Sequence, residues 1–155
     1  MTIGVLFVCT GNICRSPMAE GVFRSMARRA GLDSALIIDS AGTYGGHAGE
    51  PPSLPAIKAA ARRGYDISGL RARPVVAADI ARFDQVLAMD RGHMAVLRQL
   101  APPALVGRLR MFADADVADP YGGSERDYKR AFDAIEAGCR DLLATLTPEA
   151  KAQIA

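Results

Sequence analysis

The segment Cys9–Pro17, which reads CTGNICRSP, constrains the fold of this chain more than any other feature. It follows an apolar run, Ile3–Val8, that is typical of a buried parallel strand. Ser16 can cap a helix and Pro17 suits the first helical turn, so a helix is predicted to begin where the segment ends. A loop between a strand and a helix directs several backbone N–H groups and the helix N-terminus at one point. The segment therefore predicts an anion site at the end of the first strand.

The rest of the chain alternates between strand-like and helix-like patterns. The apolar runs that predict strands are Ile3–Val8, Leu36–Ser40, Gln85–Ala88 and Arg108–Met111. The helical patterns cover Ser16 to Gly31, Leu54–Arg63, Ala77–Arg82, Asp90–Leu100 and Ser124–Leu146. Such alternation implies right-handed crossovers between parallel strands. We therefore expect an α/β fold, a doubly wound four-stranded parallel sheet flanked by helices, in a single domain spanning residues 1–155.

The carboxyl ends of parallel strands are where the functional crevice of such a sheet lies. The segment Cys9–Pro17 follows the first predicted strand. Two stretches rich in Gly and in loop-forming residues, Ala41–Pro52 and Asp114–Ser124, follow two other strands. We expect these three loops to line one rim of the sheet.

Composition narrows the function classes. Hydrophobic residues make up 50% of the chain and charged residues 23%, which excludes a disordered protein. No apolar run approaches the roughly 20 residues of a membrane span, and the N-terminal run predicts a strand rather than a signal peptide, so a cytoplasmic location is expected. A net charge of +2 gives no support for a nucleic-acid partner. Three cysteines without a CxxC pair predict neither a metal site nor a disulfide framework, and nucleotide-binding motifs are absent, so no cofactor is expected.

The thiol and the guanidinium in the loop indicate phosphate chemistry. A helix N-terminus and a nearby cation favour the thiolate form of a cysteine such as Cys9. That thiolate could attack a phosphate monoester and form a phosphocysteine, while Arg15 holds two phosphate oxygens as a planar fork. Ser16 could donate a hydrogen bond to the thiolate, and Gly11 and Asn12 tolerate the left-handed backbone that a tight cradle needs. The predicted phosphate-binding residues are Thr10, Gly11, Asn12, Ile13, Cys14 and Ser16.

Residue patterns alone do not assign the proton donor or the role of Cys14. Departure of an alcohol or phenol needs a proton, and three aspartates in one predicted rim loop could supply it: Asp114, Asp116 and Asp119. Asp119 ranks first among them, because the proline that follows it stiffens the backbone and biases the aspartate away from a helix. Cys14 either fills the packing beside the loop or forms a reversible disulfide with Cys9. Cys139 lies on an apolar helix stripe and is expected in the core. His93 lies on a predicted helix and is expected at the surface.

These motifs closely resemble those of the low-molecular-weight protein tyrosine phosphatases. The resemblance extends over essentially the whole chain, and its matching segments are Val8–Pro17, Asp39–Thr43, Ala72-Arg73, Met89-Asp90, Asp119–Tyr121 and the closing helix Tyr128–Leu143. The resemblance implies that Cys9 is the nucleophile, that Arg15 clamps phosphate and that Asp119 is the general acid and then the base. It also implies a phosphotyrosine-containing protein as the partner. No pattern in the sequence indicates the oligomeric state.

The chain departs from the family pattern at three places. Gly46 stands where many relatives carry a Trp or Tyr that forms one wall of the substrate pocket. Tyr44 and His47 are the candidates to form that wall in this chain. Leu70 stands where many relatives have a histidine that braces the loop asparagine, so Asn12 must be supported differently. Tyr121 is followed by Gly122 rather than by a second tyrosine. Tyr121 is expected either to stack on the substrate ring or to pack the loop.

Two other functions are compatible with parts of the pattern. An arsenate reductase of the same fold would need two further relay cysteines, but the expected stretch Met89–Leu100 contains none. A non-catalytic phosphopeptide-binding module would be expected to lose Cys9 or the acid, yet both are present. The pattern therefore favours metal-independent hydrolysis of tyrosine phosphate in proteins.

Overall fold

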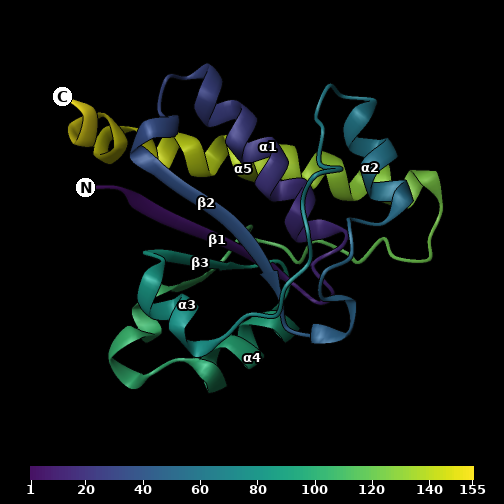
Figure 1. Cartoon of the computed structure of the whole chain (residues 1–155), viewed down its shortest axis with the longest axis horizontal. Coiled ribbons are helices and arrows are strands. Elements are labelled where there is room, and N and C mark those ends of the chain that lie inside the picture. The colour runs from purple at the N-terminus through teal and green to yellow at the C-terminus, as the bar shows by residue number, and fades with distance from the viewer.

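The computed structural model describes all residues, 1–155, and contains the predicted four-stranded parallel sheet (Figure 1). The strands lie in the order β2-β1-β3-β4, and their bounds are β1 Ile3–Cys9, β2 Leu36–Gly42, β3 Gln85–Ala88 and β4 Leu109–Met111. In the register, Cys9 lies opposite Gly42 and Val8 lies opposite Ala88. The end of β1 is therefore central in the sheet, with a neighbouring strand on each side.

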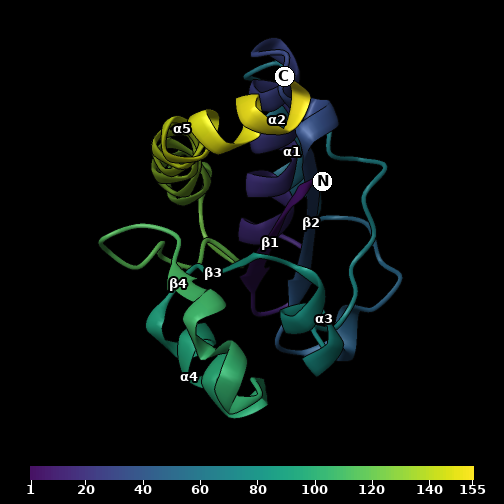
Figure 2. The same cartoon turned by 90° about the vertical axis from the view of Figure 1, so that its left-hand side faces the viewer.

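Helices cover both faces of the sheet, which confirms the doubly wound architecture (Figure 2). One face is covered by α1 (Arg15–Arg29), α2 (Leu54–Ala61) and α5 (Glu125–Ile154). The other is covered by α3 (Ala77–Arg82) and α4 (Arg91–Leu100). None of these helices is both long and apolar enough to cross a membrane.

Strand β1 separates the two hydrophobic cores because successive side chains point to opposite faces. Val5 and Phe7 belong to the larger core, beneath α1 and α5, whereas Leu6 and Val8 belong to the smaller core, beneath α3 and α4. The Phe7 ring packs edge-on against Phe23 at a centroid distance of 5.6 Å. A strand buried on both faces explains why its sequence is continuously apolar rather than alternating.

The largest error in the predicted bounds is at the C-terminal end of α5. The helix was expected to end at Leu146, but it continues through Pro148 to Ile154. Proline lacks the N–H that would bond the carbonyl four residues earlier. Leu146 and Ala150 lie one turn apart and are both buried, so packing against the larger core stabilises the helix beyond the proline.

Smaller differences lie at the functional edge of the sheet. β1 and β2 extend one and two residues beyond the predicted strand ends, to Cys9 and Gly42, and α1 begins at Arg15. Residues 103–108 form a 3-10 helix, so β4 begins at Leu109 rather than at Arg108. The loop between β1 and α1 is therefore only Thr10–Cys14, which keeps the strand end and the helix start close together.

Candidate active site

The loop between β1 and α1 forms the floor of a pocket of about 90 Å³. Two other segments complete it: the turn after β2 and the loop that precedes α5. The lining residues are Cys9, Thr10, Gly11, Ile13, Cys14, Arg15, Tyr44, His47, Asp119 and Tyr121. Most of the residues predicted from the sequence thus meet in one pocket, including all three rim candidates. The two exceptions, Asn12 and Ser16, are buried and do not line it.

The thiol of Cys9 is held by a hydroxyl on the first turn of α1. Its Sγ lies 2.9 Å from Oγ of Ser16, and both residues are buried. Oγ of Ser16 also accepts a hydrogen bond from Nδ2 of Asn12 at 2.8 Å. The single Ser16 hydroxyl proton has two acceptors within reach, Sγ of Cys9 at 2.9 Å and the carbonyl of Ala41 at 3.4 Å, and the shorter contact is to the sulfur. This contact agrees with the hydrogen bond predicted for Ser16.

Asn12 gives the loop its shape. It is the only non-glycine residue with a positive φ, 58°, so the predicted left-handed backbone is present here. Gly11 could tolerate the same conformation but does not adopt it, because its φ is not positive. Gly11 is instead limited by space, because a Cβ there would lie 3.0 Å from Cδ2 of His47.

The support of Asn12 comes from two segments beyond the loop. Oδ1 of Asn12 accepts a hydrogen bond from the backbone N–H of Arg73 at 3.0 Å. Its Nδ2 donates to Oγ of Ser40 at 2.9 Å, and Ser40 in turn donates to Oε1 of Glu20 at 2.7 Å. These groups therefore brace Asn12 in a chain that carries Leu70 in place of the histidine of many relatives.

Glu20 anchors the outer end of this chain of hydrogen bonds. It is buried on α1 and forms an ion pair with Arg24 at 2.7 Å. Burial raises the pKa of Glu20, while hydrogen bonds from Ser40 and Arg24 act in the opposite direction. Because the carboxyl group takes the single hydroxyl proton of Ser40, the Ser40 oxygen can only accept from Asn12. The resulting order, Glu20 to Ser40 to Asn12 to Ser16, ends at the Cys9 thiol.

Arg15 is buried and is clamped on one side of its guanidinium group. Nη1 donates to Oδ2 of Asp90 at 2.9 Å and to the carbonyl of Val117 at 2.8 Å. Nη2 lies 3.6 Å from Oδ2 of Asp119. The Nη1 side is therefore fully engaged, and the Nη2 side faces the pocket.

Asp90 is a carboxylate held in its ionised form. Burial acts to raise the pKa of Asp90, but the backbone N–H of His93 and the guanidinium of Arg15 outweigh it, and the pKa is lowered. Asp90 is also the N-cap of α4 and accepts the N–H of His93 at 3.0 Å. The helix start and the ion pair thus hold the same carboxylate in place.

The prediction that His93 lies at the surface is wrong. Only 3% of it is exposed, because its ring turns back from the third position of α4 toward the loop. Nε2 lies 2.8 Å from Oγ1 of Thr10 and 3.4 Å from Nη2 of Arg15. The spacing Asp90-x-x-His93 at a helix start is a signal of reciprocal capping that could have identified it.

Asp119 is the only one of the three candidate aspartates that lines the pocket. Its side chain is 52% exposed, and Oδ1 accepts the N–H of Tyr121 at 3.1 Å. Asp116 instead accepts the N–H of Arg91 at 3.2 Å and so faces the start of α4. The geometry therefore distinguishes Asp119, which the residue pattern ranked first, from the other two aspartates.

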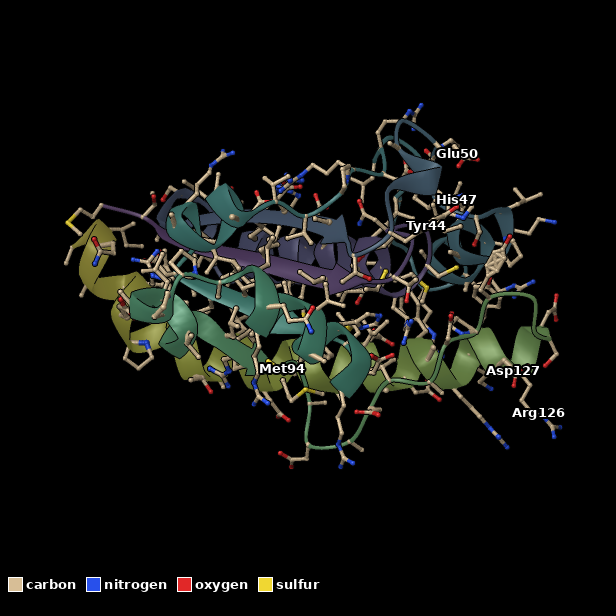
Figure 3. All side chains as sticks on the ribbon, turned by 90° about the horizontal axis from the view of Figure 1, so that it is seen from below. Tyr44, His47, Glu50, Met94, Arg126 and Asp127 are labelled. Carbon is tan, nitrogen blue, oxygen red and sulfur yellow. The ribbon has the colours of Figure 1, made fainter.

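Aromatic side chains surround the mouth of the pocket. Tyr44, His47 and Glu50 gather on the loop that follows β2, which includes the short 3-10 turn Gly45–His47 (Figure 3). The His47 ring lies 5.9 Å from the Tyr44 ring and 6.3 Å from the Tyr121 ring. A side chain at Gly46 would collide with the ring of Tyr44. Tyr44 thus occupies the space that a larger residue at position 46 would need.

The other two cysteines have different surroundings. Sγ of Cys14 lies 3.2 Å from Oγ of Ser53 and 3.3 Å from the hydroxyl of Tyr128, and burial raises the pKa of the Cys14 thiol. All three cysteines are free, so a disulfide between Cys9 and Cys14 stays a prediction. Cys139 is fully buried in the larger core, as expected.

The fold and the pocket together define a parallel α/β protein with a cysteine- and arginine-containing anion loop after its first strand. A sequence model of one family, described as low molecular weight phosphotyrosine protein phosphatase, matches residues 4–152. The chain therefore belongs to this family, whose members are protein-tyrosine-phosphatase enzymes, and the resemblance found in the sequence is confirmed.

Individual relatives match over nearly their whole length. The chain is 38% identical over 154 residues to the low molecular weight protein-tyrosine-phosphatase YfkJ of Bacillus subtilis, covering 95% of this chain and 97% of the relative. It is 40% identical over 165 residues to a low molecular weight protein-tyrosine-phosphatase of Streptomyces coelicolor, covering 100% of both. A crystal structure of a protein tyrosine phosphatase from Entamoeba histolytica, with Hepes in the active site, superposes with a TM-score of 0.91 at 33% identity and covers 96% of this chain and 99% of that one.

Proposed function

We propose that this protein hydrolyses the phosphate ester of tyrosine residues in proteins through a phosphocysteine intermediate on Cys9. The main observation behind the proposal is that a thiol, a guanidinium and a carboxylate line the same pocket. Cys9, Arg15 and Asp119 all line it, although Asp119 is more than 100 residues away along the chain. Family membership supports the general reaction, and the pocket supports these particular residues.

In the first step the Cys9 thiolate attacks phosphorus in line with the ester bond. The S–P bond forms while the P–O bond breaks, and Asp119 gives its proton to the departing tyrosine oxygen. Backbone N–H groups of the loop and the Nη2 side of the Arg15 guanidinium, whose contacts are longer than those of Nη1, stabilise the charge on the equatorial oxygens. Because Asp90 and Val117 hold Nη1, the guanidinium is oriented before the substrate arrives.

In the second step water replaces the cysteine. Asp119, now a carboxylate, takes a proton from the water, whose oxygen attacks phosphorus as the S–P bond breaks. The Cys9 thiolate is then the leaving group, and the hydrogen bond from Ser16 stabilises the charge that returns to sulfur. Inorganic phosphate leaves and the site returns to its starting state. The residues present supply every proton transfer and every positive charge that these two steps require, so the proposed reaction is metal-independent.

The aromatic rim supports an aryl ester as the substrate. Tyr44, His47 and Tyr121 stand around the mouth of a small pocket, where they can contact the face or the edge of a phosphotyrosine ring. A phosphoserine would leave these rings without a partner. We therefore propose that the rim selects phosphotyrosine, and that the Tyr121 ring stacks on the substrate.

The decisive experiment is turnover of an aryl phosphate in the presence of a metal chelator. The wild-type protein should release phosphate, and Cys9→Ser should reduce the rate to background, whereas Cys139→Ala, in the core, should retain activity. Rapid quenching should trap phosphate on the Cys9 peptide of the wild-type protein. Normal turnover by Cys9→Ser would overturn the mechanism. The two alternatives are not favoured, because α4 carries no relay cysteine and both Cys9 and Asp119 are present in the pocket.

A further inference from the structure

The catalytic pocket continues into three open hollows that run between α2 and the start of α5. Their volumes are about 380, 190 and 470 Å³ in order from the pocket. Each hollow shares lining residues with the next. The pocket and the first hollow share Ile13, His47 and Tyr121, the first and second share Pro55 and Tyr128, and the second and third share Arg62 and Glu125. We call these three hollows the α2–α5 groove.

The two hollows of the groove that lie farther from the pocket are strongly cationic. Their charged lining residues are Lys58, Arg62, Arg63, Arg126, Lys129 and Glu125, so five cations face one carboxylate. Asp133 and Glu136, which pair with Arg63, bring two further carboxylates close to these cations. Arg126 extends outward from the start of α5 (Figure 3).

Pairing leaves part of this charge available for a ligand. Arg62 pairs with Glu125 at 2.8 Å, and Arg63 pairs with two carboxylates of α5. Lys58, Arg126 and Lys129 form no ion pair. Lys58 lies on α2 and Lys129 on α5, so an unpaired ammonium group is present on each wall of the groove.

The groove also carries a few apolar side chains. The exposed Leu54 and Pro55 on α2 line the second hollow, and the buried ring of Phe132 lines the third. The guanidinium of Arg63 lies 4.8 Å from the Phe132 ring centroid. Apolar side chains among cationic ones suit an extended peptide with carboxylate side chains, because its apolar parts can contact the former while its charges reach the latter.

We propose that the α2–α5 groove binds acidic residues that flank the phosphotyrosine of the protein substrate. This inference rests on the proposed function and names the class of substrate that the site prefers. The continuity of the groove with the catalytic pocket favours the substrate chain itself as the occupant. The hollowed shape, and the carboxylate of Glu125 within it, are less suited to a flat anionic membrane surface.

The test compares two phosphotyrosine peptides that differ only in charge. One carries glutamates on both sides of the phosphotyrosine, and the other carries glutamines at the same positions. The wild-type protein should show a kcat/KM about three- to tenfold higher for the glutamate peptide at low ionic strength, with the preference falling as salt is added. An aryl phosphate without flanking residues measures the catalytic pocket alone.

The variant Lys58→Gln/Lys129→Gln removes the unpaired charge from both walls. Its preference for the glutamate peptide should largely disappear, while its turnover of the aryl phosphate stays at the wild-type level. The matched control is Arg98→Gln/Lys151→Gln, which changes the net charge equally, on exposed residues of α4 and of the far end of α5. This control should keep the full preference.

The outcomes separate this proposal from the proposed function. No turnover of any phosphate ester would overturn the phosphatase itself. If the protein turns over the aryl phosphate but shows equal kcat/KM for the two peptides, only the proposal about the groove is overturned. The same holds if the two double variants show the same preference for the glutamate peptide. Binding to phosphatidylserine vesicles that Lys58→Gln/Lys129→Gln abolishes, without a peptide preference, would assign the groove to membranes and also overturn the proposal.

Discussion

Nε2 of His93 lies 2.8 Å from Oγ1 of Thr10, which ties the start of α4 to the first residue of the anion loop. Nδ1 of the same ring accepts the backbone N–H of Asp90 at 3.1 Å. Nδ1 also lies 3.1 Å from Oδ1 of Asp90, so the ring contacts both the backbone and the carboxylate of the cap residue. Because Nη2 of Arg15 is only 3.4 Å from Nε2, a positive charge on the ring is disfavoured, and the neutral imidazole fits this arrangement.

His93 should make the folded state sensitive to acid. Burial lowers the pKa of His93, Asp90 acts in the opposite direction, and Arg15 adds to the lowering. The unfolded chain takes up this proton near pH 6.5, and the folded protein does so only at lower pH. The free energy of unfolding should therefore begin to fall as the pH drops below about 6.5. The total decrease should be about 1.4 kcal/mol for each unit by which the pKa of His93 in the folded protein lies below that in the unfolded chain. The decrease should end once the pH is below the pKa of the folded protein.

Urea unfolding between pH 7.5 and 5 measures this effect. His93→Gln should show a smaller decrease in the free energy of unfolding over that range than the wild-type protein, because glutamine does not titrate. His47→Gln changes the only other histidine and serves as the comparison variant. Equal slopes in wild type and His93→Gln would show that His93 is not the titrating group.

Ser16→Ala should slow the reaction of Cys9 with iodoacetate at pH 6. The variant removes the hydroxyl that lies 2.9 Å from Sγ, and a hydrogen bond to a charged group contributes about 1.5–3 kcal/mol to the charged form. The alkylation rate should fall about tenfold, as followed by mass spectrometry of the Cys9 peptide. Ser25→Ala, which alters an exposed hydrogen bond on the same helix, should react like the wild-type protein. An unchanged rate in Ser16→Ala would remove Ser16 from this role.

Asp119→Asn should reduce kcat for an aryl phosphate by about 10²–10⁴-fold, because asparagine cannot donate the proton that the leaving oxygen needs. The loss should be smaller for esters of more acidic phenols, whose oxygens leave without protonation. Asp116→Asn is the matched control, since Asp116 faces the start of α4 rather than the pocket. If Asp116→Asn shows the larger loss, the acid has been assigned to the wrong residue.

Gly42→Ala should destabilise the protein and disturb the anion loop. A Cβ at Gly42 would lie 2.5 Å from the backbone oxygen of Thr10 and 3.0 Å from the backbone nitrogen of Asn12. Because backbone atoms cannot move aside as a side chain would, we expect a loss of about 1–3 kcal/mol in the free energy of unfolding.

Thermal and urea unfolding give the stability of Gly42→Ala, and aryl phosphate turnover gives its activity. Gly107→Ala is the matched control, since a Cβ there meets nothing within 4 Å. It should keep both stability and activity close to the wild-type values. Wild-type turnover by Gly42→Ala would show that the loop tolerates displacement at this point.

Much of the fold could be predicted because its signals are local. The continuous apolar run of β1 indicated a strand buried on both faces, and Ser16-Pro17 marked the start of α1 to within one residue. The end of α5 could not be predicted in this way. Pro148 is a local signal against a helix, and it is outweighed by the burial of Leu146 and Ala150 against distant parts of the chain.

The sequence by itself determined the chemistry of the loop, because Cys9, Asn12 and Arg15 are placed by a few consecutive backbone dihedral angles after one strand. Only the tertiary structure decided which distant groups act on that loop. Ser40, Asp90, His93 and Asp119 reach it from three other segments through parallel strands that end at the same edge. A residue pattern along the chain does not show which distant residues become neighbours, so by itself it ranked Asp119 first without excluding the other two aspartates, and it placed His93 at the surface. In the folded sheet only Asp119 of the three lines the pocket, and His93 is buried.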